Sequence, residues 1–339
     1  MAKVLITGAS GFIGSHLAEA LVARGDDVTC LVRRSSRVER LDPLDVRFAC
    51  GDVTDPQSLS AAVGNVETVY HAAGCTCAIH AEQYDRVNHL GTRNVVEACA
   101  ARTTPPVLVV VSSLAAAGPA VDGQPRTESD PPRQVSHYGR SKRAAELAAE
   151  QFADRVPVTV VRPPIVLGEA DRLGLPMFAM ISRLGVFFVN GMGRKRYSII
   201  HATDLAELLI RAAEQGERLP VAPAEGDARS QGYYFAACGE DPTYAELGRM
   251  IGSALGRRRV LIFPTPPRGP WVAAALMELK ARVRRRAVYL NFDRVREIRA
   301  GSWICSSRKA VDELGFTVAA PLAERLKQTA HWYREHGWI

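Results

Sequence analysis

A glycine-rich turn near the start of the chain constrains its fold more than any other feature. The turn, Gly8-Ala9-Ser10-Gly11-Phe12-Ile13-Gly14, follows a short apolar run, Lys3–Ile6, and precedes a helical pattern, Ser15–Arg24. Glycines let the backbone turn sharply and approach a ligand closely, and the N–H groups and dipole at a helix N-terminus favour an anion such as a diphosphate. In this context the turn predicts a nucleotide-binding loop, the alternative being a tight turn without a ligand.

The same alternation of strand and helix continues through the first half of the chain. Further runs typical of buried strands lie at 28–32, 46–50, 68–71, 107–112 and 158–162, and helical patterns lie at 85–101 and 137–152. Continuous apolar runs such as Val107–Val111 fit strands covered on both faces. The pattern predicts the α/β class, with a doubly wound parallel sheet of the Rossmann type.

The second half is less regular and predicts a smaller α/β lobe. We expect residues 1–167 to form the dinucleotide-binding domain and residues 197–237 to return to it. Residues 168–196 and 238–339 would then form a substrate-binding lobe over the carboxyl ends of the strands, where ligands bind in such folds.

Tyr138 and Lys142 are the clearest candidates for chemistry. A spacing of four residues places both side chains on one face of a helix. A phenol has a pKa of about 10 and is a poor acid or base at neutral pH, but a nearby ammonium lowers that pKa. Tyr138 can then exchange a proton with an alcohol or ketone oxygen. The alternative is a chance pair on a helix surface.

Two serines end the run at 107–112 and give a candidate for polarising the substrate oxygen. A hydroxyl at this position can donate a hydrogen bond to an oxygen that gains negative charge. Ser112 and Ser113 both qualify. The alternative is that both hydroxyls only cap the backbone.

These motifs together resemble the extended branch of the short-chain dehydrogenase/reductase superfamily. The glycine spacing, Gly-x-x-Gly-x-x-Gly, is that of the superfamily, and its catalytic Ser or Thr precedes a Gly by five residues, which selects Ser113 before Gly118. The resemblance implies that Tyr138, Lys142 and Ser113 are catalytic, that Lys142 also holds the nicotinamide ribose, and that Asn88 helps to shape a proton path. An Asn that only bonds backbone would look the same in sequence.

The resemblance also implies further cofactor contacts. In Gly51-Asp52-Val53-Thr54-Asp55, the residues Asp52 and Val53 occupy the adenine-contacting places. The segment Ala72-Ala73-Gly74 lines the nicotinamide ribose, and Pro163 and Ile165 lie beside the nicotinamide. With the glycine loop, the expected cofactor-binding residues are Gly8, Gly11, Phe12, Ile13, Gly14, Arg33, Asp52, Val53, Ala72, Ala73, Gly74, Tyr138, Lys142, Pro163 and Ile165.

The segment Arg162–Gly168 narrows the expected reaction. Sugar-nucleotide epimerases usually carry an aromatic residue and Asn where Pro163-Pro164 stands, and dehydratases place Asp-Glu where Leu114-Ala115 follows Ser113. The proline form resembles the 3β-hydroxysteroid dehydrogenase and dihydroflavonol reductase subgroup. It implies hydride transfer on a bulky, hydrophobic secondary alcohol or ketone of the steroid, sterol or flavonoid kind. An epimerase with tightly bound NAD and a non-catalytic NAD(P)-sensing protein are the alternatives.

The end of the second predicted strand favours NADP over NAD. NAD-binding domains of this kind usually place Asp or Glu there, to bond the ribose 2′-hydroxyl. This strand ends Leu31-Val32-Arg33-Arg34 without a carboxylate, and Arg33 can pair with a 2′-phosphate. The alternative is a pair of solvated arginines in an Arg-rich chain.

Composition leaves the location and partners of the protein less certain. The net charge is +7, but no nucleic-acid motif is visible, and the scattered cysteines predict neither a disulfide framework nor a metal site. We expect a cytoplasmic protein, with a homodimer left open. The apolar stretch Trp271–Leu279 and the arginines at 282 and 284–286 are too short to span a bilayer. They can wall a pocket, pack in the lobe's core, or give peripheral membrane contact through 271–286.

Overall fold

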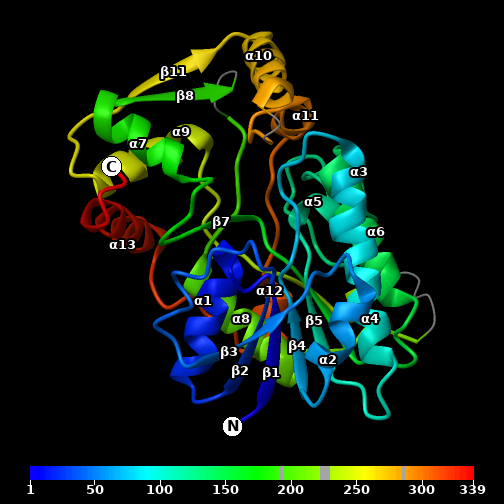
Figure 1. Cartoon of the computed structure of the whole chain (residues 1–339). Coiled ribbons are helices and arrows are strands. Elements are labelled where there is room, and N and C mark those ends of the chain that lie inside the picture. The colour runs from blue at the N-terminus through cyan, green and yellow to red at the C-terminus, as the bar shows by residue number, and fades with distance from the viewer. Residues whose placement is uncertain (191–193, 222–229, 285–286) are drawn as a thin grey trace.

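A parallel sheet at the centre of the chain positions every candidate motif. The computed structural model describes residues 1–190, 194–221, 230–284 and 287–339. Its largest sheet has the strand order β10-β6-β5-β4-β1-β2-β3, and all neighbouring strands in it run parallel (Figure 1). The strands are β1 (Lys3–Thr7), β2 (Asp27–Val32), β3 (Val46–Cys50), β4 (Thr68–His71), β5 (Val107–Val111), β6 (Val158–Arg162) and β10 (Tyr233–Phe235).

Helices cover both faces of this sheet, which confirms the predicted doubly wound class. Alternate residues of one strand enter different cores: Val4 and Ile6 lie in one cluster and Leu5 in the other. The first face is covered by α1 (Phe12–Ala23), α8 (Ala202–Gln215) and α12 (Arg308–Leu314). The second is covered by α2 (Leu59–Val63), α4 (Gly91–Ala100) and α6 (His137–Glu150). Short segments connect these elements: η1 (Pro56–Ser58), α3 (Ala81–Tyr84), η2 (Asp85–Leu90) and α5 (Leu114–Ala117).

A third core lies beyond the carboxyl ends of the strands. Phe178, Phe187, Ile251 and Tyr333 are fully buried there. The elements around it are α7 (Leu175–Leu184), β8 (Val186–Asn190), α9 (Tyr244–Ala254), β11 (Leu261–Thr265) and α13 (Leu322–Glu335). Strands β8 and β11 pair in parallel. They lie at the end of the molecule opposite the N-terminus, beside α10 (Gly269–Arg284) and α11 (Phe292–Ala300) (Figure 1).

The structure differs from the expected organisation at two places. In residues 197–237, expected to return to the dinucleotide-binding domain, the first strand is β9 (Ile199–His201), and it pairs with β7 (Ile165–Leu167) in a separate sheet rather than with the central one. Residues 308–316, expected in the lobe, place Ala310, Leu314 and Phe316 in the core of the central sheet. Both segments are short, and short apolar segments do not specify which sheet or core they join. The wider division into two domains stays a prediction.

Candidate active site

The glycine loop connects β1 to α1 and lies against the end of β4. Gly8 has a φ of +72°, and a Cβ on it would lie 2.5 Å from the backbone nitrogen of Ala73. A Cβ on Gly14 would lie 2.3 Å from the carbonyl oxygen of Gly8. Both positions therefore require glycine. Gly11 precedes α1 and offers no capping side chain, so the first N–H groups of the helix are available to an anion.

Phe12 and Ile13 open α1 and lie half-buried under the loop. The Phe12 ring lies edge-on to the imidazole of His16, with 5.3 Å between the ring centroids. This contact lies within α1 and packs the first turn of the helix. The cradle thus consists of the glycine backbone and the start of one helix, which fits a bound diphosphate.

The ends of β2 and β3 hold the residues expected near the adenosine half of the cofactor. Arg33 follows β2 and is exposed. Its backbone N–H donates to the Ser36 hydroxyl at 3.0 Å, and its guanidinium has no partner among the described residues. Asp52 follows β3, and its Oδ1 accepts hydrogen bonds from the N–H and the hydroxyl of Thr54, both at 2.9 Å. The Val53 side chain packs in the core, and its carbonyl accepts from the Asn94 amide at 2.9 Å.

The segment after β4 lies between the glycine loop and α6. The N–H of Ala72 donates to the Thr7 carbonyl at 3.1 Å, and the N–H of Ala73 donates to the Thr7 hydroxyl at 3.3 Å. A Cβ on Gly74 would lie 3.4 Å from Asn88 Oδ1 and 3.5 Å from Lys142 Nζ. Gly74 therefore marks the point where the loop, η2 and α6 meet.

Asn88 lies in η2, a π-helical segment. Such segments are rare in proteins, and those that occur are often found at functional sites. Its side chain is 1% exposed. It accepts from the Cys75 N–H at 2.7 Å, and its amide donates to the Cys75 carbonyl at 3.0 Å and to Ser141 Oγ at 2.9 Å. These contacts hold the loop after Gly74 against α6. They match the backbone-bonding interpretation, and a proton path through Asn88 stays a prediction.

The structure separates the two candidate serines. Ser112 Oγ is buried and donates to Glu146 Oε1 at 2.5 Å, which gives it a structural partner. Ser113 begins α5, where its Oγ accepts from the Ala115 N–H at 3.1 Å. Ser113 also hydrogen-bonds the Tyr138 phenol, a contact that lowers the phenol's pKa. Of the two serines, Ser113 is therefore the one whose hydroxyl lies beside the Tyr138 phenol.

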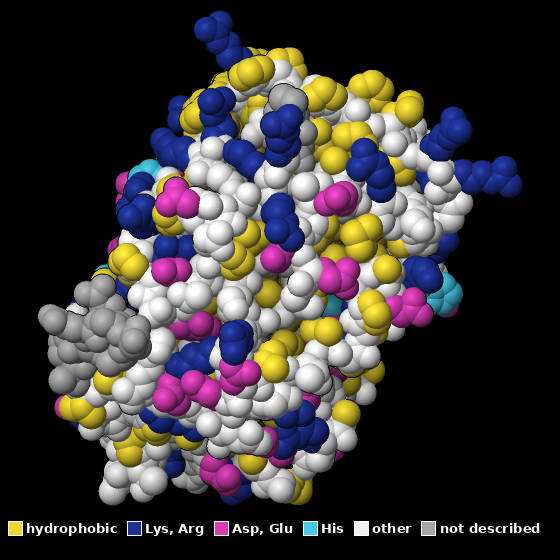
Figure 2. All heavy atoms as spheres, turned by 180° about the vertical axis from the view of Figure 1, so that it is seen from behind, with side chains coloured by type: hydrophobic (Ala, Val, Ile, Leu, Met, Phe, Trp, Pro, Cys, Tyr) yellow, Lys and Arg dark blue, Asp and Glu magenta, His cyan; other side chains and the backbone are white. Residues whose placement is uncertain are grey.

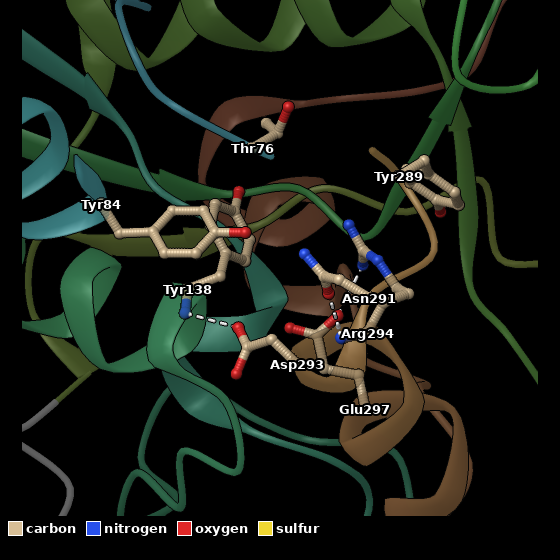
Figure 3. A pocket seen from close by; sticks show the side chains of 8 residues that line it. All are labelled: Thr76, Tyr84, Tyr138, Tyr289, Asn291, Asp293, Arg294 and Glu297. Atoms are coloured by element: carbon tan, nitrogen blue, oxygen red, sulfur yellow. Dashed lines mark hydrogen bonds and ion pairs between the residues drawn. The ribbon is translucent and has the colours of Figure 1, made fainter. Parts of the chain in front are cut away.

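Tyr138 lies in the first turn of α6 and lines a pocket between that helix and α11 (Figure 3). Burial raises its pKa to about 12, while the Ser113 hydrogen bond and the Arg294 charge act in the opposite direction. The Tyr84 ring lies edge-on to it, with 5.9 Å between centroids. The other residues that line the pocket are Thr76, Tyr84, Tyr289, Asn291, Asp293, Arg294 and Glu297.

Lys142 is buried one turn after Tyr138, and its Nζ donates to the Val111 carbonyl at 2.7 Å. Burial lowers its pKa to about 8, against the opposing effect of the Glu146 carboxylate. The ammonium thus lies at the end of β5, close to Gly74, rather than at the surface of the helix. That Tyr138 and Lys142 act together from one side of α6 stays a prediction from their spacing.

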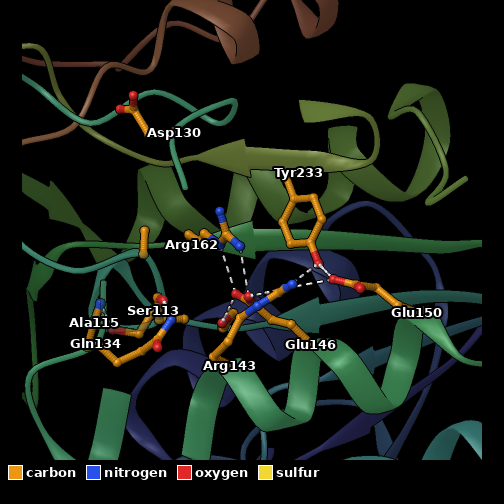
Figure 4. Close-up of polar contacts among 12 residues, drawn as sticks. Ser113, Ala115, Asp130, Gln134, Arg143, Glu146, Glu150, Arg162 and Tyr233 are labelled. Carbon is orange, nitrogen blue, oxygen red and sulfur yellow. Dashed lines mark hydrogen bonds and ion pairs between the residues drawn. The ribbon is translucent and has the colours of Figure 1, made fainter. Parts of the chain in front are cut away.

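A buried ion pair fixes the middle of α6. Glu146 forms two hydrogen bonds with Arg162 of β6, at 2.8 and 2.7 Å, and pairs with Arg143 at 3.0 Å (Figure 4). The two cations hold the pKa of Glu146 below its usual value despite complete burial. A charged carboxylate here ties α6 to the sheet and keeps a negative charge one turn from Lys142.

Pro163 and Ile165 follow Arg162 at the carboxyl end of β6. The Pro163 carbonyl accepts from the Leu114 N–H at 2.8 Å, which places it directly beside Ser113. Ile165 begins β7 and is half-buried. Both therefore lie at the same edge of the sheet as the predicted catalytic group.

Sequence reasoning missed the contribution of α11 to the pocket. Arg294, Asp293 and Glu297 belong to no recognisable motif, and they lie far along the chain from Tyr138. The only signal was the expectation that the C-terminal part of the chain covers the strand ends.

The region beyond the pocket carries an exposed apolar surface. The sequence marked the apolar stretch Trp271–Leu279 but left its environment open. Along α10 only Ala274 and Ala281 are buried, so the helix does not pack in the lobe's core. Figure 2 shows hydrophobic side chains and Lys or Arg together at this end of the molecule. The exposed apolar side chains are Phe188 of β8, Leu261 and Phe263 of β11, and Val272, Leu276, Met277, Leu279 and Val283 of α10.

Basic side chains adjoin this apolar surface. Arg268, Lys280, Arg282 and Arg284 are exposed, while Arg285 and Arg286 lie outside the described residues. None of the helices in the described ranges is long and apolar enough to cross a membrane.

Comparison with known proteins agrees with this geometry. A family model described as "NAD dependent epimerase/dehydratase family" matches residues 4–222. A ceramide reductase from Caulobacter vibrioides is 30% identical over 339 residues, which are 99% of this chain and 96% of the relative. The human sterol-4-alpha-carboxylate 3-dehydrogenase, decarboxylating, is 30% identical over 223 residues, 64% of this chain and 58% of that one.

Solved structures extend the similarity to the whole chain. A UDP-glucose 4-epimerase from Thermotoga maritima, solved with UDP-glucose, has a TM-score of 0.77 at 20% identity, with 98% of this chain and 99% of that chain covered. At that identity the similarity shows the fold alone.

Proposed function

Because this chain belongs to the NAD-dependent epimerase/dehydratase family, we propose that it transfers hydride between a nicotinamide dinucleotide and a bulky, apolar secondary alcohol or ketone. The observations that support the proposal are the hydrogen bond between Ser113 and the Tyr138 phenol, and the burial of Lys142 one turn along the same helix, against the Val111 carbonyl at the end of β5. A phenol, a hydroxyl and an ammonium at that place can handle the proton and the charge of a reacting carbon–oxygen bond.

The three side chains have distinct roles in this mechanism. When bound, the nicotinamide donates hydride to the carbonyl carbon or accepts it from the alcohol carbon. In reduction, Tyr138 gives its phenolic proton to the substrate oxygen as that oxygen gains charge, and in oxidation the phenolate takes the proton back. Ser113 donates a hydrogen bond to the same oxygen. Lys142 supplies a positive charge that favours the phenolate, and the family resemblance adds a role in holding the ribose.

The residues around the sheet edge fit a dinucleotide, and we propose NADP as the preferred form. Gly8, Gly11 and Gly14, with Phe12 and Ile13, would hold the diphosphate at the start of α1. The unpaired guanidinium of Arg33 supports a 2′-phosphate partner, since no carboxylate ends β2. The remaining contacts would come from Asp52, the Val53 backbone, Ala72, Ala73, Gly74, Pro163 and Ile165. Asn88 would act by holding the loop after Gly74 in place.

The substrate proposal joins a polar pocket to an apolar surface. The side chains nearest Tyr138, among them Tyr84, Asn291 and Arg294, suit the oxygen-bearing end of a substrate. The exposed apolar residues of β8, β11 and α10 suit a hydrophobic remainder. Relatives named as a ceramide reductase and a sterol dehydrogenase support a sterol or related lipid.

The same apolar residues support a proposed contact with a membrane surface. An apolar helix face bordered by Lys and Arg lies in a lipid interface and favours anionic headgroups. We therefore propose a cytoplasmic protein that takes its substrate at or near a membrane through residues 271–286, with the exposed edges of β8 and β11 as part of the same surface.

A sugar-nucleotide epimerase is the second candidate, favoured by the polar lining of the pocket and by the Arg294 cation. Arg294 is paired with Glu297, however, and Pro163-Pro164 stands where epimerases usually place an aromatic residue and Asn. An absorbance assay of NADPH oxidation with long-chain and steroid ketones tests the first proposal. Purified protein that retains NAD and shows no net oxidation with any ketone would favour the epimerase.

A further inference from the structure

The N-terminus of the catalytic helix is capped by a residue from the distant helix α11. The first N–H groups of an α-helix have no partner within the helix. In α6, the N–H of His137 donates to Asp293 Oδ1 at 2.7 Å and the N–H of Tyr138 donates to Asp293 Oδ2 at 3.0 Å. Figure 3 shows the second of these bonds beside the pocket. The backbone of Tyr138 itself is therefore held by a carboxylate.

A second acid of α11 strengthens the same junction. Ser136, the residue before α6, accepts from the Gly139 N–H at 2.8 Å and donates its own hydroxyl proton to Glu297 Oε1 at 2.7 Å. Asp293 and Glu297 are only 8% and 6% exposed. Glu297 is also paired with Arg294. Buried acids are costly unless they are well partnered, so these contacts account for their place between the two helices.

The helix that supplies the cap also forms one wall of the pocket. Asn291, at the N-terminus of α11, and Arg294, in its first turn, line the pocket that Tyr138 faces. Helix α11 is in turn tied to α10, because the Phe292 N–H donates to Glu278 Oε1 at 2.9 Å and the Trp271 and Phe292 rings lie 5.7 Å apart. The position of Tyr138 is thus linked to the helix that lines the pocket.

We propose that Asp293 is a positioning residue for Tyr138, so that docking of α11 against α6 sets both the pocket wall and the place of the phenol. Both oxygens of Asp293 accept from backbone N–H groups, and Oδ1 also lies 3.4 Å from Arg296 Nη1, so in this proposal Asp293 acts on the reaction through the start of the helix. Reaction rates respond steeply to such placement, since a shift of about 1 Å can cost about a hundredfold. The inference rests on the proposed function, in which Tyr138 is the acid and base.

The test compares three variants by kinetics and by hydrogen exchange. Asp293→Ala removes both acceptors. Asp293→Asn keeps the size and one acceptor oxygen, and it carries the test if the alanine variant fails to fold. Thr243→Ala is the matched control, because Thr243 caps α9 of the same lobe by accepting from the Glu246 N–H at 3.2 Å and, among the described residues, has no hydrogen bond to α6 or α11. Each variant is measured for kcat, KM, NADP affinity and amide exchange in the peptide that covers residues 136–141.

We expect kcat of Asp293→Ala to fall about ten- to a hundredfold, with NADP affinity unchanged and amide exchange at 136–141 accelerated. Asp293→Asn should lie between Asp293→Ala and the wild type, and Thr243→Ala should match the wild type in all four measurements. Unchanged exchange, or accelerated exchange with an unchanged kcat, overturns the inference. Exchange needs no substrate, so a wild-type protein without ketone turnover would refute the proposed function and leave the cap itself separately tested.

Discussion

Arg294 lies close enough to Tyr138 for its guanidinium charge to lower the pKa of the phenol, although burial raises that pKa to about 12. The nearby Glu297 carboxylate has the opposite effect and raises it. The two charges of one ion pair on α11 thus act with opposite signs on the proposed acid and base. This arrangement makes the pH dependence of the reaction a property of residues outside the recognised motifs.

The pH profile should therefore move in opposite directions in two variants. In alcohol oxidation the phenolate is the active form, so kcat/KM is lost as pH falls through the pKa of Tyr138. Arg294→Met removes a positive charge, raises that pKa and should move the acid limb to higher pH. Glu297→Gln removes a negative charge and should move it to lower pH. Arg294→Lys keeps the charge and is the control. Shifts of the same sign in both variants, or no shift, would contradict the assignment.

Removing the phenolic hydroxyl tests the central residue directly. Tyr138→Phe keeps the ring and its contact with Tyr84 but cannot transfer a proton. Loss of such catalysis lowers the rate about a hundred- to ten-thousandfold, whereas NADP binding, measured by fluorescence titration, should be retained. Ser112→Ala is a useful contrast, because that hydroxyl is buried and bonds Glu146. Near-full turnover by Tyr138→Phe would mean that another group supplies the proton.

The cofactor preference depends on one exposed side chain. Hydrogen bonds to charged groups contribute about 1.5–3 kcal/mol, so Arg33→Ala should weaken NADP binding about tenfold or more and leave NAD binding unchanged. Arg47→Ala is the control, since Arg47 is exposed near the same sheet edge and pairs with Asp27 at 2.5 Å. Calorimetric titration with both cofactors measures the effect. Wild-type protein that binds NAD more tightly than NADP would refute the preference.

Charge reversal tests the proposed membrane surface. A basic residue near an anionic bilayer contributes about 1 kcal/mol of attraction, so Arg282→Glu with Arg284→Glu should reduce flotation with anionic liposomes, and adding Arg285→Glu and Arg286→Glu should reduce it further. The matched control is Arg155→Glu with Arg308→Glu, because both arginines are exposed elsewhere on the molecule. Equal flotation of the wild type and the four-site variant would exclude the basic cluster as a lipid contact.

The sequence predicted the central sheet and the motifs on it because their signals are local. Buried parallel strands are continuous apolar runs, and the observed strands end within a residue or two of the expected places. Gly8, Ser113 and Tyr138 each lie next to the end of a strand or of a helix. The order of the strands therefore places all three residues at the same edge of the sheet. The comparisons confirm the family resemblance on which the residue roles were expected, while the roles themselves remain predictions.

The residues of the pocket wall could not be predicted from the sequence, because no local sequence pattern marks them. Asp293 looks like any acid in a helix, and its value as a cap of α6 depends on packing between elements far apart in the chain. The exposure of Leu276 and Val283 could not be predicted for the same reason. An apolar helix has the same sequence pattern whether it packs in a core or faces solvent. Such features are decided by tertiary contacts rather than by residue type.

Transfer of a labelled hydride tests the account most directly. The protein is incubated with NADPH that carries deuterium at C4 of the nicotinamide, together with a steroid ketone or a long-chain ketone in one reaction and a UDP-sugar in another. The account predicts deuterium on the carbinol carbon of the apolar product, detected by mass spectrometry, and its loss in Tyr138→Phe. Interconversion of the UDP-sugar without deuterium uptake, and no labelled product from either ketone, would contradict it and identify the protein as an epimerase.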